Sequence, residues 1–166
     1  MRVLFLTRLY WPHIGGVEKH VEEVSKILSQ KHEITIVTEQ YDPKLSQFET
    51  RDGVKIYRIP LLSRGEESVK KWLIWKWFVT HLNLINQAEV IHIHDVFYWF
   101  LPFRLPYFWK KAYITFHGYE GHLPTATEVL WHRLAAALTR GHICIGGFHP
   151  KWYHVSPTFV SYGAVA

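Results

Sequence analysis

The chain contains 166 residues, of which 48% are hydrophobic and 20% charged, and its net charge at pH 7 is +5. This length suits one domain, and so large an apolar fraction excludes a disordered chain. The single cysteine, Cys144, excludes a disulfide framework and a cysteine-based zinc site. No run reaches the ~18 apolar residues of a membrane-spanning helix, and the apolar start at Arg2–Leu6 is too short for a signal peptide. We therefore expect one cytoplasmic domain over residues 1–166.

The excess of positive charge lies in the second part of the chain. Residues 68–166 contain nine basic and four acidic residues, and seven of the eight tryptophans. A basic surface rich in tryptophan is suited to an anionic membrane, a nucleic acid or a phosphorylated ligand. The same residues also fit a core helix with solvated lysines. No basic-aromatic RNA-binding motif is present, so we do not expect a nucleic-acid partner.

Short apolar segments alternate with helical patterns along the chain. In chain order, the patterns predict a strand at 2–7, a helix at 17–31, strands at 33–38 and 54–59, a helix at 66–86, strands at 89–94 and 112–116, a helix at 125–139, and short strands at 142–145 and 158–161. Pro102 and Pro106 should break the aromatic segment 97–111 into short pieces. Apolar strands that alternate with helices indicate an α/β fold, a Rossmann-like doubly wound parallel sheet.

Ligands bind such sheets outside the carboxyl ends of the strands, so the residues that follow each predicted strand matter most. Gly15 and Gly16 follow the first strand and directly precede a helix. Glycine lets a backbone approach a ligand closely, and a helix N-terminus favours an anion such as phosphate. A tight turn into the helix explains the pair equally well. Neither GxGxxG nor GxxxxGK[ST] is present, which disfavours a dehydrogenase and a P-loop NTPase.

Histidines end two further strands. His92 and His94 alternate along one strand and point to the same face, with His92 in mid-strand as an expected core residue and His94 at the end, where it can reach a site. A metal pair is the alternative, but no carboxylate-rich partner set accompanies it, so we expect no metal.

His117 ends the next strand, where a histidine can donate to a ligand oxygen, transfer a proton or cap the following helix. Gly118 allows a sharp turn beside it. Asp95 and Glu120 are the carboxylates nearby, and they fit either an acid/base pair or helix capping.

The predicted second helix has more apolar surface than one packed face requires. Lys70, Lys71 and Lys76 are interleaved with three tryptophans, and the segment 97–111 has the same cationic and aromatic character. An extra apolar face needs a partner, such as another helix, a lipid or another domain. We expect the surface made by Lys70–Trp77 and Phe97–Lys111 to meet an anionic membrane.

Four segments together resemble a known family. They are Met1–Thr7 with Tyr10-Trp11-Pro12 and Gly15–Val21, Asp52–Pro60 (DGVKIYRIP), Ala88–Asp95 (AEVIHIHD) and Thr115–Gly118 (TFHG). The chain resembles the N-terminal domain of GT-B glycosyltransferases of family 4, also described as glycosyl transferase group 1. It departs from the family pattern at Gly146-Gly147, where a serine is usual, and at Tyr162-Gly163, which replaces Asn-Gly.

This resemblance implies the acceptor-side half of a retaining hexosyltransferase that needs no metal or other cofactor. The donor is then a nucleotide-diphosphate sugar and the acceptor a saccharide or a lipid-linked sugar. The C-terminal donor-binding domain is expected outside this chain, on the same or a separate polypeptide. The protein is then cytoplasmic or peripheral on the inner face of a membrane. The alternatives are a non-catalytic acceptor- or partner-binding module and a subunit of a split glycosyltransferase.

The resemblance also implies roles for particular residues. Gly15 and Gly16 would bind the donor diphosphate, and His117 would be the catalytic residue beside the donor sugar. The expected acceptor-site residues are Tyr10, His13, His94, Asp95, Gly118 and Glu120.

Overall fold

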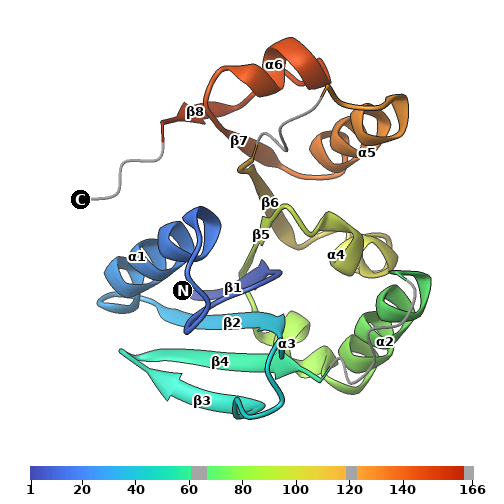
Figure 1. Ribbon diagram of the computed structural model, residues 1–166. Helices are drawn as coiled ribbons and strands as arrows, with labels where there is room; N and C mark the ends of the chain where they lie inside the picture. The colour runs from blue at the N-terminus through green and yellow to red at the C-terminus, as the bar shows by residue number, and fades with distance from the viewer. Residues whose placement is uncertain (61–66, 119–122, 163–166) are drawn as a thin grey trace.

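The computed structural model describes residues 1–60, 67–118 and 123–162. Its centre is an eight-stranded sheet with the order β3-β4-β2-β1-β5-β6-β7-β8 (Figure 1). The strands are β1 Arg2–Thr7, β2 Glu33–Glu39, β3 Phe48–Arg51, β4 Val54–Ile59, β5 Val90–His94, β6 Lys111–Phe116, β7 Gly141–Ile145 and β8 Phe159–Ser161. All pairs are parallel except β3 with β4. The chain crosses from β2 and β4 on one side of β1 to β5 on the other, which confirms the predicted doubly wound class.

The helices cover both faces of this sheet. They are α1 Gly16–Ser29, α2 Glu67–Thr80, α3 Leu82–Gln87, α4 Phe97–Arg104, α5 Ala126–Ala137 and α6 Phe148–Tyr153. Figure 1 shows α1 on one side of the sheet and α2 and α4 on the other. Because strand side chains alternate, Phe5 of β1 packs in the core under α1, whereas Leu4 and Leu6 pack in the core under the opposite helices.

The aromatic segment after β5 is helical through Pro102, where a break was predicted, and the helix ends at Arg104, before Pro106, as predicted. Pro102 lies inside α4 and has no N–H to donate to the carbonyl of Tyr98, four residues earlier. The Trp75 indole of α2 donates to that same Tyr98 oxygen at 2.8 Å. A side chain from the neighbouring helix thus satisfies the acceptor that proline leaves free, and α4 continues to Arg104.

Three further elements differ from the sequence prediction. The helix expected at 66–86 is two helices, because the backbone leaves the helical conformation at His81, whose ring stacks on Trp77. Strand β3 was not predicted, and it pairs with β4 through the turn at Asp52-Gly53, where both residues have positive φ. Helix α6 was also not predicted.

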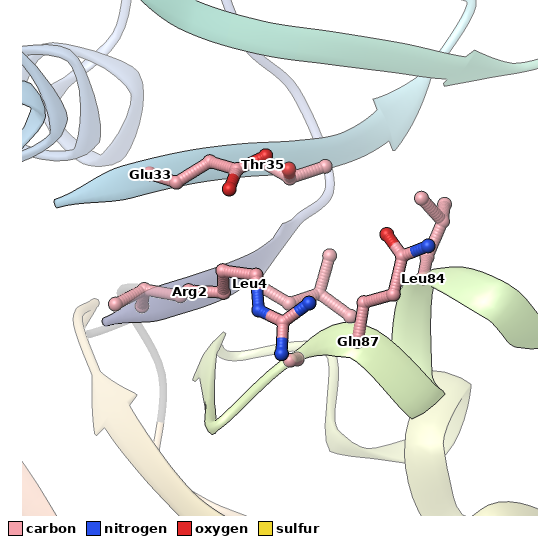
Figure 2. Close-up of a pocket in the computed structure, with 8 residues that line it drawn as sticks. Arg2, Leu4, Glu33, Thr35, Leu84 and Gln87 are labelled. Carbon is pink, nitrogen blue, oxygen red and sulfur yellow. The ribbon is translucent and has the colours of Figure 1, made fainter.

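A small hollow lies at the amino edge of the sheet. Its volume is about 20 Å³. Figure 2 shows residues that line it, among them Arg2 of β1, Glu33 of β2, and Leu84 and Gln87 of α3. That volume suits about one water molecule.

None of the helices in the described ranges has both the length and the apolar character that crossing a membrane requires.

Candidate functional site

A large cleft lies at the opposite, carboxyl edge of the sheet. Its volume is about 1150 Å³, and its lining includes the residues that follow three adjacent strands. Arg8 follows β1, Asp95 follows β5 and Gly118 follows β6. The first turn of α1 and parts of α2, α4, α5 and α6 also line it. This is the edge at which an α/β sheet is expected to bind its ligand.

Two pairs of side chains hold β5 and β6 together near this edge. Parallel register sets His92 beside Tyr113 and His94 beside Thr115, so alternate residues of both strands share one face. His92 is half-buried rather than a full core residue, and its Nε2 lies 2.8 Å from Thr115 Oγ1, so the expected hydrogen-bonded structural role is supported. One step further along, His94 Nδ1 lies 2.8 Å from His117 Nε2.

His20 joins these rings from helix α1, and the sequence analysis missed it. Its ring centroid lies 5.0 Å from that of His117 and 6.1 Å from that of His94. Helical spacing could have identified it, because His20 follows Val17 by three residues and so lies on the stripe that faces the sheet. The structure thus gathers four histidines from β5, β6 and α1.

Burial keeps these imidazoles neutral at pH 7. Burial is the main cause that lowers the pKa of His92 to about 4, with the nearby His20 as a smaller cause. Burial, and then the neighbouring His20, lowers the pKa of His117 to about 3. The pKa of His94 falls well below its ordinary value for the same main reason, and that of His20 is also lowered by burial. A neutral imidazole donates one hydrogen bond and accepts one, so this cluster is suited to orient a polar ligand rather than to carry charge.

Asp95 joins the same strand ends through its backbone and its carboxylate. Its N–H donates to Thr115 O at 3.1 Å, and its Oδ1 accepts from the backbone N–H of His117 at 3.0 Å. Its φ is 61°, a left-handed conformation that is uncommon for residues other than glycine. The predicted acid/base pair of Asp95 with Glu120 is not tested, because Glu120 lies outside the described residues.

The two glycines before α1 have different surroundings. The Glu18 carboxylate lies over Gly15 and would overlap a Cβ there, whereas a Cβ at Gly16 would meet nothing within 4 Å. Glu18 Oε1 also lies 3.0 Å from His13 Nδ1. Gly15 therefore makes room for an acidic side chain of its own helix, whereas the space beside Gly16 is open.

Two of the residues expected to line the acceptor site lie apart from the cluster. Tyr10 is 4% exposed in the core under α1, and its hydroxyl lies 3.3 Å from Ser25 Oγ. His13 is paired with Glu18 and contacts the Tyr41 ring. Neither belongs to the cleft lining, unlike His94, Asp95 and Gly118. The placement of Tyr10 corrects the expectation that it lines the site, since its ring is used for packing and its hydroxyl is hydrogen-bonded inside the core.

Comparison with known proteins assigns the chain to a family. Residues 14–146 match the family model of Glycosyltransferase Family 4. The chain belongs to glycosyltransferase family 4. The fold agrees with this assignment, because the chain is similar to sucrose-phosphate synthase from Thermosynechococcus elongatus with a TM-score of 0.70 and 10% identity. That similarity covers 96% of this chain and 47% of the synthase chain, and it confirms the Rossmann-like half of a GT-B architecture.

Two curated relatives are similar to the family 4 domain in sequence. The GDP-mannose:cellobiosyl-diphosphopolyprenol alpha-mannosyltransferase of Xanthomonas campestris is 28% identical over 138 residues, which cover 78% of this chain and 34% of that protein. A phosphatidylinositol N-acetylglucosaminyltransferase subunit of Homo sapiens is 25% identical over 97 residues, which cover 57% of this chain and 20% of that protein. The chain thus spans between about a fifth and about a third of the length of these relatives.

The cleft of this family 4 domain combines apolar walls with a few charges. Trp75, Tyr98 and Leu101 line it from α2 and α4, and Trp131 lines it from α5. The cations in its described lining are Arg8 and Lys71. Within the described part of the chain, no group of three or more His, Cys, Asp or Glu side chains could hold a metal ion. Independence from metals stays a prediction.

Proposed function

We propose that this chain is the acceptor-binding half of a glycosyltransferase that moves a hexose from a nucleotide-diphosphate sugar to a saccharide or lipid-linked acceptor. The observation that carries the proposal is the cleft at the carboxyl edge, where His94, Asp95 and Gly118 of adjacent strands meet beside His117. Membership of glycosyltransferase family 4 supports the reaction class.

The lining of the cleft favours an acceptor that carries a lipid. Aromatic and aliphatic side chains form most of the walls along α2, α4 and α5, which suits an apolar chain better than a bare sugar. Arg8 and Lys71 offer positive charge for a phosphate group. Both relatives named above have a lipid in their names, phosphatidylinositol in one and a diphosphopolyprenol in the other.

The donor approaches the same edge from the side of α1. The open flank of Gly16 at the helix N-terminus would accept the diphosphate, and Glu18 would have to move before Gly15 could contribute. His117, neutral at pH 7, would contact the donor sugar and stabilise the oxocarbenium-like transition state through its polar ring rather than through a charge. Retention of the anomeric configuration and independence from metals are carried over from the resemblance to the family.

A transfer assay tests this function directly. The purified chain, alone and with any polypeptide that co-purifies with it, is incubated with radiolabelled UDP- and GDP-hexoses and with polyprenyl-diphosphate sugars or free saccharides. We expect label in the lipid fraction, unchanged by EDTA, with the donor's anomeric configuration kept in the product. Transfer to no acceptor by either preparation, together with no change in tryptophan fluorescence on adding acceptor, would argue against the proposal.

A second candidate is a binding component within a larger glycosyltransferase complex. The observation that favours it is the name of the human relative, which describes that protein as one subunit. In that case the chain binds acceptor without transferring sugar on its own. Acceptor binding by the chain, together with transfer by the reconstituted complex that His117→Ala leaves unchanged, would identify this arrangement, since the lead proposal makes His117 catalytic.

We also propose contact with an anionic membrane, through a smaller surface than the sequence indicated. Trp72 is 56% exposed with the Lys76 ammonium 5.2 Å above its ring, and Lys71 lies at the cleft. Arg104 and Lys110, by contrast, donate to backbone carbonyls, and Trp99 is fully buried.

Vesicle co-sedimentation tests the membrane contact. Binding should require anionic lipid, weaken as salt rises, and fall when Lys70, Lys71 and Lys76 are changed to glutamine, since each cation near the surface contributes ~1 kcal/mol. Lys26→Gln on α1 is the matched control. Equal sedimentation with neutral and anionic vesicles would count against this surface.

A further inference from the structure

Two adjacent residues at the end of β5 hold His117 at two different atoms. His94 Nδ1 lies 2.8 Å from the ring atom Nε2 of His117, and Asp95 Oδ1 accepts from the backbone N–H of His117 at 3.0 Å. His94 is 1% exposed and His117 8% exposed, so water competes little for the bond between the two rings, whereas Asp95 is exposed and its bond to the main chain is part-buried. His117 is therefore fixed both in its ring and in its main chain.

The surroundings of His94 decide which way the bond between the rings runs. Both rings are neutral, so one Nε2 or Nδ1 atom donates and the other accepts. His94 Nε2 is buried and has no hydrogen-bond partner among the described residues. A buried N–H without a partner is rarer in proteins than a buried acceptor without one. The proton of His94 is therefore best placed on Nδ1, where it is donated to His117 Nε2.

This direction determines what His117 can offer a ligand. Since its Nε2 accepts from His94, its own proton must lie on Nδ1. The described residues supply no hydrogen-bond partner for that Nδ1–H. His117 thus keeps one donor available beside the cleft lined by its neighbours Phe116 and Gly118.

The backbone of Asp95 indicates that this arrangement is maintained against a cost. Its φ of 61° lies in the left-handed region, which costs a residue other than glycine roughly 1 kcal/mol or more. The left-handed residue lies between His94 and the next turn, and its carboxylate reaches His117 on the neighbouring strand. Strain of this kind is found at sites where a side chain must be held in one orientation.

We propose that His94 and Asp95 are positioning residues for His117: His94 fixes the tautomer with the proton on Nδ1, and Asp95 fixes the main chain, so that His117 offers an N–H donor to a sugar hydroxyl. The identity of the ligand oxygen rests on the proposed function. The tautomer of His117 and its two bonds to His94 and Asp95 do not depend on the proposed function, and they can be tested without any substrate.

Nitrogen NMR of the full chain labelled at histidine reads the tautomer directly. At pH 7.5 the wild-type His117 should show a protonated Nδ1 and an unprotonated Nε2. His94→Asn keeps an amide donor close to the position of Nδ1, so it should preserve this pattern. His94→Phe keeps a ring of similar shape without the donor, so His117 should shift toward a protonated Nε2. His92→Phe, on the same face of the same strand, is the control and should leave the His117 tautomer unchanged, although its ring contact with His94 can shift the signals.

A second pair of variants tests Asp95. Asp95→Asn retains a side-chain oxygen that can accept, whereas Asp95→Gly relieves the positive φ but removes the acceptor. Hydrogen exchange of the His117 amide should accelerate at least tenfold in Asp95→Gly and stay within about twofold of wild type in Asp95→Asn. A role of Asp95 in main-chain geometry alone predicts the opposite ranking, since glycine adopts that φ more readily.

The transfer assay then connects the tautomer with activity. His94→Phe should lower turnover at least tenfold, equivalent to ~1.4 kcal/mol, and His94→Asn should restore most of it. A wild-type His117 with its proton on Nε2, or a His94→Phe chain with an unchanged tautomer, overturns the proposal even if that variant is active. Full activity of His94→Phe despite an altered tautomer also overturns the positioning role while leaving the glycosyltransferase function intact. If no preparation transfers sugar, the proposed function fails and the NMR results still decide the tautomer.

Discussion

Acid should destabilise this protein through its buried neutral histidines. The pKa of His117 is lowered to about 3, and those of His92 and His149 to about 4, from an ordinary value of 6.5, mainly by burial. His149 is an extreme case, since it is fully buried and neither of its ring nitrogens has a hydrogen-bond partner among the described residues. Between pH 6.5 and about 4 the unfolded chain binds protons at these positions and the folded chain does not. The free energy of unfolding therefore decreases as the pH falls through this range.

The size of the effect follows from the pKa shifts. At pH 5 the unfolded state gains RT ln(1 + 10^1.5), or about 2 kcal/mol, for each histidine that stays neutral when folded. His92, His117 and His149 together then lower the free energy of unfolding by about 6 kcal/mol between pH 7.5 and pH 5. Domains of this size are stable by only ~5–15 kcal/mol, so the protein should be close to unfolding at pH 5.

Urea unfolding followed by tryptophan fluorescence at pH 7.5, 6.5, 5.5 and 5 measures this loss. His149→Phe removes one buried titrating ring and sacrifices no hydrogen bond that the structure shows, so its loss between pH 7.5 and pH 5 should be about 2 kcal/mol smaller than that of wild type. His154→Asn is the control, because His154 is exposed and asparagine tolerates its positive φ. A wild-type loss below about 1 kcal/mol, or an undiminished loss in His149→Phe, would refute the reasoning.

Three further outcomes can be measured. His117→Ala should lower transfer by about 100-fold, as removal of a transition-state hydrogen-bond donor does, and His92→Ala by less than tenfold; equal losses in two folded variants would remove the argument from placement at the strand end. Gly15→Ala should shift the ring resonances of His13, since the added Cβ displaces the Glu18 carboxylate that is paired with that ring. Gly16→Ala is the control and should leave these resonances in place. Identical spectra of the two variants would mean that the Glu18 carboxylate does not lie over Gly15. The isolated chain should bind nucleotide-diphosphate sugars only weakly by calorimetry, because the donor-binding domain is expected outside this chain. Micromolar affinity would contradict the expectation that the other domain binds the nucleotide.

Much of the fold could be predicted because the core strands carry strong local patterns. β1 and β2 are largely buried runs rich in aliphatic and β-branched residues, and β4 alternates buried apolar residues with Lys55 and Tyr57. The observed bounds of all three strands differ from the predicted ones by at most one residue. β3 was missed because its four residues are half-buried or exposed and show no apolar alternation. The pattern also could not show that α4 continues through Pro102, since the compensating donor, Trp75, comes from a segment more than twenty residues away.

The sequence predicted at which edge of the sheet the site lies, but not which side chains make contact there. The sequence placed His94, Asp95, His117 and Gly118 at the ends of parallel strands. The structure shows that these two strands, β5 and β6, are neighbours and that the residues lie together. Tyr10 follows β1 in the sequence like a site residue, yet its hydroxyl bonds to Ser25 fifteen residues later, a contact that local pattern cannot reveal.

The cations in the second part of the chain also show what sequence reasoning misses. They connect the proposed lipid-linked acceptor with the proposed membrane contact. Of the cations in the second part of the chain, Arg104 donates to the Leu138 carbonyl and Lys110 to those of Asn86 and Ala88, so neither extends a free basic surface. Two of the remaining lysines lie over aromatic rings of α2 and α4, Lys76 over Trp72 and Lys71 over Tyr98. Because Lys71 and Tyr98 also line the cleft, the cationic and aromatic surface is continuous with the proposed acceptor site. A lipid-linked acceptor could then enter the cleft from the membrane surface without its apolar chain crossing water. In the transfer assay with anionic vesicles, Lys71→Gln should therefore lower transfer to a long-chain acceptor more than transfer to a short-chain, water-soluble one. Without vesicles, Lys71→Gln should affect transfer to both acceptors equally.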